Sequence, residues 1–207
     1  MTVKEPGIME LAWSKPLTRG VTHKPDQFRI VAPGLAWGDE RWSLPVNILS
    51  PFYPYRYRAA QDVTMVVIHH SAGAPTGTAR QFAAYHAAQG GKNWPGIGYH
   101  FVVKPGRIVY AGDILTIRYH SGPGNLHGIG ICCPGNFERE KPSAELLATL
   151  RLLIARLSEH VGHALEVKAH RDLMSTACPG RFMLERWSDL LPSLLPTEVT
   201  ESDQAGK

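Results

Sequence analysis

The sequence predicts an α/β fold: a central mixed β-sheet flanked by helices, with an irregular N-terminal extension. Two observations support this prediction. Short runs of β-branched and apolar residues alternate along the chain with segments of helical period, and the length of 207 residues with 43% hydrophobic content suits one well-packed domain plus an extension. Two full-sized domains would need a longer chain.

The chain divides by composition into three parts. Residues 1–60 are rich in Pro, Gly, Trp and Tyr and show no sustained period, so we expect an irregular extension with at most short strands. Its aromatic run PFYPYRYR (51–58) would either wrap the domain, the simpler interpretation, or form a surface for polysaccharide. Residues 61–192 would form the folded domain and residues 193–207 a flexible tail.

The first elements of the domain are a strand and a helix. VTMVVIHH (63–70) is almost wholly apolar until its end, which is typical of a strand buried on both faces. A helix over 79–89 follows, because Thr78 and Gln81 have capping-box spacing and Gly90 with Gly91 provides a stop.

Further strands and helices alternate beyond this point. Residues 99–104 and 107–112 flank a Pro-Gly turn and predict a hairpin, and 129–133 predicts another buried strand. A long helix begins after Ser143, where leucines recur at helical spacing. A strand over 165–170 ends in a histidine, and a last helix is expected around 180–190.

Composition excludes several classes of protein. The N-terminal MTVKEPGIMELAWSKP carries acidic residues and prolines where a signal peptide needs an apolar run, and no stretch approaches about 18 apolar residues, so neither secretion by that route nor a membrane span is expected. The net charge of +4 is mild, and the sequence shows no basic run with interleaved aromatics. Nucleic-acid binding is therefore not expected.

Two segments carry the candidate chemistry, His69-His70 at one strand end and HRDLMSTACPGRF (170–182) after another. Strand ends are where an α/β sheet places ligands. A zinc ion that hydrolyses an amide needs about three protein ligands and an open position, which His69, His170 and Cys178 would supply. Spacing alone leaves the choice between His69 and His70 open, and ordinary surface or core histidines are the alternative.

Four blocks resemble a known family. IHHSAG (68–73), GYHFVV (98–103), HGIGICCPGNF (127–137) and AHRDLMSTACPGRF (169–182) are similar, in this order, to the blocks of the type-2 N-acetylmuramoyl-L-alanine amidases. That family includes endolysins of the T7 lysozyme kind and is related to the peptidoglycan recognition proteins. The resemblance covers about residues 62–190.

The resemblance implies a role for individual residues. His69, His170 and Cys178 would bind Zn²⁺, and Tyr99 would be catalytic, close to the attacking water or the oxyanion. His70 would then lie behind the ligands or in the wall of the substrate cleft, and His120 would be a cleft histidine.

One position departs from the T7-like pattern. Thr176 stands where those enzymes carry a catalytic lysine, so it is either a hydroxyl donor in the site or a structural cap. Arg171 and Asp172 are expected to orient the ligand loop.

The remaining candidates are interpreted as structural. Asn136 and Phe137 are expected to hold a turn. No role in the site is assigned to His86, His160, His163, Cys132 or Cys133, the last two being interpreted as buried strand thiols.

The implied function is zinc-dependent cleavage of the bond between N-acetylmuramic acid and L-alanine in peptidoglycan, by a monomer made without a signal peptide and acting on the wall after release. Two alternatives remain. One is a non-catalytic peptidoglycan-binding module, which the intact ligand set disfavours. The other is an amidase of soluble muropeptides, although the recycling amidases carry aspartate in place of the ligand cysteine.

Overall fold

A computed structural model describes residues 25–191, which contain a six-stranded mixed sheet. The strands lie in the order β1-β4-β3-β5-β2-β6, and every neighbouring pair is parallel except β3 and β4. The predicted fold class is therefore confirmed. The strand bounds are β1 Ala36–Asp39, β2 Met65–His70, β3 Phe101–Lys104, β4 Arg107–Tyr110, β5 Gly128–Cys133 and β6 Glu166–Ala169.

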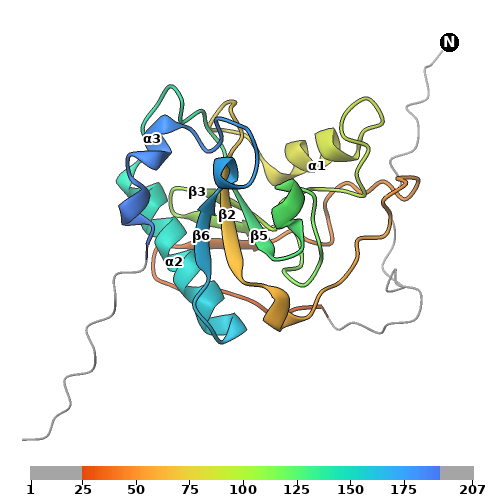
Figure 1. Cartoon of the computed structure of the whole chain (residues 1–207), viewed down its shortest axis with the longest axis horizontal. Helices are drawn as coiled ribbons and strands as arrows, with labels where there is room; N and C mark the ends of the chain where they lie inside the picture. Colours follow the sequence, from red (N-terminus) through yellow and green to blue (C-terminus); the bar gives the residue numbers. More distant parts are fainter. Residues whose placement is uncertain (1–24, 192–207) are drawn as a thin grey trace, which may run out of the picture.

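Two main helices cover the sheet, one on each face (Figure 1). Helix α1 spans Ala79–Ala87, and the side chain of Thr78 accepts a hydrogen bond from the N–H of Gln81 in the predicted capping box. Helix α2 spans Ala144–Val161 and ends at Gly162, whose φ of 82° suits glycine. The 3-10 segments are η1 Ala60–Asp62, η2 Gly122–Asn125, η3 His170–Asp172 and η4 Trp187–Asp189.

The prediction of a single helix around 180–190 is wrong. The structure has a short α3, Arg181–Leu184, followed after a break at Arg186 by η4. Met183 and Leu190 are buried in the core on either side of the break. Because these two positions also have the spacing of one continuous helix, the apolar pattern alone does not reveal the interruption.

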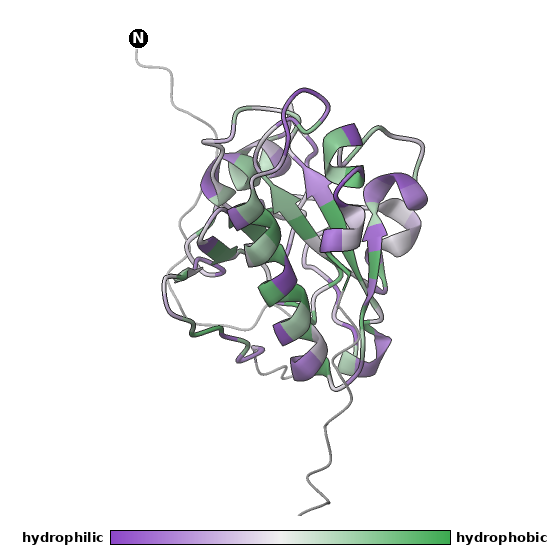
Figure 2. Cartoon of the chain, turned by 90° about the vertical axis from the view of Figure 1, so that its left-hand side faces the viewer, coloured by the Kyte–Doolittle hydropathy of each residue, from purple (hydrophilic) through white to green (hydrophobic). Residues whose placement is uncertain are grey.

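The two faces of the sheet differ in character. Against α2 lies a large apolar cluster that includes Ile68, Ile131 and the leucines of α2, and Figure 2 shows the hydrophobic strands behind this amphipathic helix. Against α1 lies a smaller cluster that includes Ile97, Val102 and Ala83. The side of the sheet that carries α1 therefore has room for polar side chains.

The described part of the N-terminal extension, residues 25–60, joins the same fold. Strand β1 pairs with β4 at the edge of the sheet, and Phe28 enters the main core. Arg58 is 6% exposed and donates hydrogen bonds to the carbonyls of Ile114, Asn125, Leu126 and Gly128. These contacts show that this part of the extension wraps around the domain. Within the aromatic run, Phe52 remains 48% exposed. Residues 1–24 and the predicted tail lie outside the described residues.

Across residues 25–191, the structure has no helix of the length and apolar character that crossing a membrane requires.

Candidate metal-binding active site

Strand β2 delivers two adjacent histidines to opposite faces of the sheet. Side chains alternate along a strand, so Ile68 and His70 face α2 while His69 faces α1. His70 indeed stacks on Phe137 of the α2-side cluster, with ring centroids 6.2 Å apart. His69 is 1% exposed and packs against Tyr99 instead, with ring centroids 5.2 Å apart.

His69, His170 and Cys178 come together at the carboxyl ends of β2 and β6. One ligand atom from each lies within 4.8 Å of the other two. The His69 and His170 rings are 4.4 Å apart between centroids, and Cys178 Sγ lies 3.8 Å from His69 Nδ1. The structure thus brings together the three residues for which the sequence predicts metal binding.

The loop that carries His170 and Cys178 is held by hydrogen bonds within itself. The Asp172 carboxylate accepts from the N–H of Ala169 at 2.8 Å, and the N–H of Arg171 donates to the Cys178 carbonyl at 2.9 Å. Thr176 Oγ1 accepts from the N–H of Cys178 at 3.2 Å. Asp172 and Arg171 therefore act on the backbone of this loop, and Thr176 caps it.

A relay of hydrogen bonds orients the ring of His69. Nε2 of His120 lies 3.2 Å from the Gly128 carbonyl, which can only accept, so this nitrogen carries the proton. Nδ1 of His120 then accepts from Nε2 of His69 at 3.2 Å. This arrangement leaves the lone pair of His69 on Nδ1, the atom that faces Cys178.

His120 lies behind His69. Its side chain is 8% exposed, and its ring packs on β5 where Gly128 and Gly130 leave space. A Cβ at Gly130 would stand 2.7 Å from the His120 ring, so a larger residue there would displace it. The predicted cleft role of His120 stays a prediction, whereas its contact with His69 is a feature of the fold that the sequence reasoning missed.

His70 contributes through its backbone as well as its ring. Its N–H lies 3.4 Å from Cys178 Sγ, and its Nδ1 accepts from the N–H of Phe137 at 3.1 Å. The ring therefore fixes the turn after β5, as expected for Phe137, and the backbone supports the cysteine.

The electrostatics suit a metal ion. Burial lowers the pKa of His69 well below 6.5, and burial also lowers the pKa of His170, so both imidazoles are neutral and able to ligate. Burial raises the pKa of the Cys178 thiol to about 11, and a bound cation would reverse this shift by stabilising the thiolate. Nε2 of His170 is buried without a hydrogen-bond partner among the described residues, as a position reserved for a ligand would be.

Tyr99 stands beside this cluster, just before β3. Burial raises the pKa of its phenol well above 10, so the hydroxyl stays protonated and can donate. Helix α1 supports this segment through His86, whose Nδ1 accepts from the N–H of Gly98 at 3.1 Å and whose ring lies 5.4 Å from that of Tyr99. No role was expected for His86 from the sequence, although its helical spacing from Ala79 and Ala83 marks the buried side of α1.

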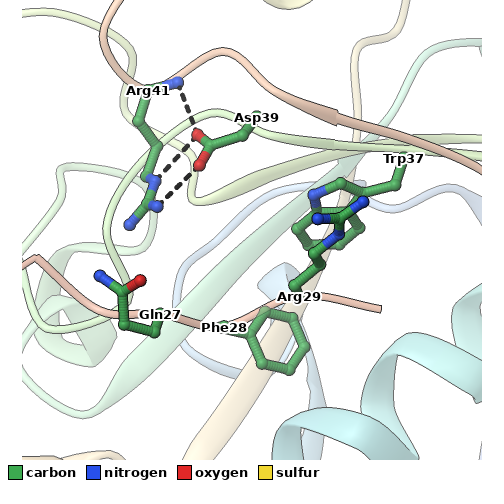
Figure 3. Close-up of a pocket in the computed structure, with 6 residues that line it drawn as sticks. All are labelled: Gln27, Phe28, Arg29, Trp37, Asp39 and Arg41. Atoms are coloured by element: carbon green, nitrogen blue, oxygen red, sulfur yellow. Dashed lines mark hydrogen bonds and ion pairs between the residues drawn. The ribbon is translucent and has the colours of Figure 1, made fainter. Parts of the chain in front are cut away.

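A shallow pocket lies elsewhere, on the N-terminal segment. Figure 3 shows its lining, in which Asp39 pairs with Arg41. It shares no residue with the cluster at the strand ends, and Arg41 is committed to ion pairs with Asp39 and Asp113.

Neutral imidazoles, a cysteine and a buried phenol at the carboxyl edge of an α/β sheet form a site of the kind that metal-dependent hydrolases use. The family model described as N-acetylmuramoyl-L-alanine amidase (Amidase_2) matches residues 59–181, more than half of the chain. The chain therefore belongs to this amidase family.

Curated relatives include both enzymes and recognition proteins. The endolysin of Enterobacteria phage T3 is 32% identical over 141 residues, which cover 64% of this chain and 89% of the endolysin. The endolysin of Escherichia phage T7 is 28% identical with the same coverage. Peptidoglycan recognition protein 1 of Bos taurus is 34% identical over 134 residues, 59% of this chain and 70% of that protein.

Solved structures share the fold. Drosophila PGRP-LB aligns with a TM-score of 0.62 and 23% identity, covering 74% of this chain and 94% of its own. The amidase LysC from Clostridium intestinale aligns with a TM-score of 0.57 and 24% identity, covering 73% and 95%.

Proposed function

We propose that this protein is a zinc-dependent amidase that cleaves the bond between N-acetylmuramic acid and the L-alanine of the stem peptide. The observation that carries the proposal is the convergence of His69, His170 and Cys178, in a chain that belongs to the amidase family. Peptidoglycan is the substrate in this proposal, since the relatives include phage endolysins and peptidoglycan recognition proteins.

The donor set fits zinc. Two imidazole nitrogens and one thiolate are ligands that zinc accepts, and three protein ligands leave a position open for chemistry. When bound there, zinc would supply Lewis-acid polarisation and acidify water near the scissile carbonyl. His120 would keep the His69 lone pair directed at the site, and the Thr176 cap would hold Cys178 in place.

The protein's own groups would stabilise charge on the substrate. Tyr99 is protonated at neutral pH and would donate a hydrogen bond to the carbonyl oxygen of the lactyl group as that oxygen becomes negative. The Thr176 hydroxyl proton offers a second donor near the loop, although it lacks the positive charge of a lysine. Because Cys178 belongs to the ligand set, no covalent step on sulfur is proposed.

A non-catalytic recognition function is the second candidate, because several relatives are recognition proteins. One structural neighbour, a tyrosine-to-phenylalanine mutant of Drosophila PGRP-LB, is described in complex with tracheal cytotoxin. The presence of all three candidate ligands and of Tyr99 in this chain favours the enzyme.

We infer that the protein meets its substrate at the cell wall after release, as its endolysin relatives would. Hydrolysis of soluble muropeptides remains the narrower alternative, and a comparison of intact sacculi with soluble fragments as substrates distinguishes the two.

The deciding experiment uses purified peptidoglycan. We expect new N-terminal alanine amines to appear without new reducing sugar ends, and the His170→Ala variant to release none. Protein that binds the wall but releases no amines would overturn the enzyme proposal in favour of recognition, and reducing ends in place of amines would assign a different bond.

A further inference from the structure

Arg58 belongs to the N-terminal extension, one position before the region that the amidase family model matches. The chain around it pairs with residues 114–117: the N–H of Arg58 donates to the Leu115 carbonyl at 2.9 Å, and Tyr57 forms a bridge with Thr116. The side chain of Arg58 is buried, and burial lowers its pKa to about 10, so the guanidinium still carries its charge at neutral pH.

The guanidinium of Arg58 joins two parts of the chain. On one side, Nε and Nη2 donate to the Ile114 carbonyl at 3.1 and 2.8 Å. On the other side, Nη1 lies 3.1, 2.8 and 3.0 Å from the carbonyl oxygens of Asn125, Leu126 and Gly128. A buried cation needs such acceptors because it has lost its water. Arg58 therefore ties the extension to the turn between η2 and β5.

Two of the residues that accept from Arg58 also hold His120. The Gly128 carbonyl accepts from Arg58 and also from Nε2 of His120, since a carbonyl oxygen has two lone pairs. The Asn125 side chain accepts from the N–H groups of His120 and Ser121, at 2.9 and 2.8 Å. Arg58 thus bonds to the acceptor of the His120 ring and to the residue that holds the His120 backbone.

His100 lies against both Arg58 and His120 without taking over this task. Its Nε2 lies 2.9 Å from the Thr116 carbonyl and therefore carries the proton, so its 3.4 Å approach to Arg58 Nη2 brings two donors together. Its ring meets that of His120 edge to face, with centroids 5.7 Å apart. The hydrogen bonds between Arg58 and His120 consequently pass through Gly128 and Asn125.

We propose that Arg58 is a positioning residue for the candidate metal site. It holds the Gly128 carbonyl and Asn125 where they fix His120, and His120 in turn leaves the lone pair of His69 on the side of the other candidate ligands. This inference rests on the proposed function, because it takes His69 as a metal ligand, and it adds a residue to that function. The extension then supports the site as well as wrapping the domain.

Arg41, in the same extension, provides a matched control. Its side chain is 7% exposed and forms ion pairs with Asp39 and Asp113, away from the candidate ligands. In Arg58→Met we expect the zinc affinity, measured by competition with a chromophoric chelator, to fall about 10-fold, the low end of the effect of groups behind metal ligands. Arg41→Met should lose stability in chemical denaturation but keep the wild-type zinc affinity.

A conservative variant covers the case in which Arg58→Met does not fold. Lysine keeps the charge but has one donating atom where arginine uses three, so Arg58→Lys should lose affinity by only about 3-fold. Wild-type zinc affinity in folded Arg58→Met would overturn the inference, because Arg58 would then only stabilise the fold. If Arg58→Met does not fold, wild-type affinity in Arg58→Lys has the same meaning.

A double-mutant cycle separates positioning from general destabilisation. If Arg58 acts through His120, then the Arg58 substitution should have no further effect on zinc affinity in a His120→Ala background. An equal fold-loss of affinity in both backgrounds would contradict the inference.

The imidazole ring of His120 gives a readout that needs no enzymatic activity. With ¹⁵N in the histidine rings, the His120 signals, assigned by their absence in His120→Ala, should show a protonated Nε2 in wild type and in Arg41→Met. In the Arg58 variant they should shift toward a mixture of tautomers, and unmoved signals would overturn the inference even in an active enzyme. Shifted signals in a protein that binds zinc but releases no amines would support the inference and refute the proposed cleavage alone.

Discussion

The two faces of the central strands carry residues of the same types for different purposes. On β2, His69 enters the candidate metal cluster while its neighbour His70 stacks on Phe137 on the opposite face. On β5, Cys132 pairs with Val102 of the α1-side cluster while its neighbour Cys133 is buried under α2. One step along a strand therefore separates a residue of the site from a residue of the core.

This contrast explains why the polar face can exist at all. The α2 face buries most of the large apolar side chains and provides the main hydrophobic stabilisation of the domain. The α1 face, with its smaller cluster, holds buried histidines whose polar atoms are paired with one another or with backbone groups. Stability and chemistry are thus divided between the two sides of one sheet.

The largest expected effect comes from exchanging one histidine of β2 for alanine. His69→Ala should lose stoichiometric zinc and reduce amine release to background, because a ligand is removed. His70→Ala should keep zinc and lose about 1–3 kcal/mol of unfolding free energy, because the Phe137 N–H loses its acceptor. Metal analysis and chemical denaturation measure both. Equal zinc loss in the two variants would contradict the division between the faces.

Removal of the Tyr99 hydroxyl should have the next largest effect. Tyr99→Phe keeps the ring packed against His69 but removes one hydrogen-bond donor, so kcat should fall about 10²- to 10³-fold with zinc content and folding intact. Steady-state kinetics on soluble muropeptide amides would measure it. A kcat within about twofold of wild type would show that this phenol has no catalytic role.

The buried His86 should make stability depend on pH. Burial lowers its pKa to about 4 from the ordinary 6.5, so it favours folding above pH 6.5, and this contribution is lost as the pH falls toward 4. That difference corresponds to at most about 3 kcal/mol. His86→Gln, which keeps an acceptor for the Gly98 N–H, should flatten the profile relative to wild type between these pH values in denaturation experiments. Parallel profiles for the two proteins would contradict this assignment.

Removal of the support that His120 gives to His69 should have a smaller effect, on zinc affinity. Loss of such a partner typically costs about 10- to 100-fold in metal affinity, so His120→Ala should bind zinc that much more weakly in competition with a chromophoric chelator. Once saturated with zinc, the variant should retain most of its kcat. An unchanged affinity together with a raised KM would instead assign His120 to the substrate cleft, as the family resemblance implies.

Much of the fold could be predicted because its signals are local. Each signal is formed by residues that are close together in the sequence. Examples are the apolar runs of β2 and β5, the Thr78–Gln81 capping box and the leucine period of α2. The break between α3 and η4 was missed, because a helix and its interrupted form place the same residues in the core.

The candidate ligands could also be predicted, since His69, His170 and Cys178 follow strand ends and match family blocks. Their supporting residues could not. His120 acts on His69 from 51 positions away, and its ring finds space only where Gly128 and Gly130 of β5 pass beneath it. Such pairings are set by tertiary packing, which no local pattern of residue types encodes.

Zinc reconstitution is the sharpest test of the proposed amidase chemistry. The purified protein would be stripped with a chelator, dialysed and titrated with Zn²⁺ while alanine amine release from peptidoglycan is followed. We predict no activity in the stripped protein and a linear return that saturates at one zinc per chain, with no return in Cys178→Ser. Full activity in the stripped protein, or saturation with no amine release, would contradict the proposal.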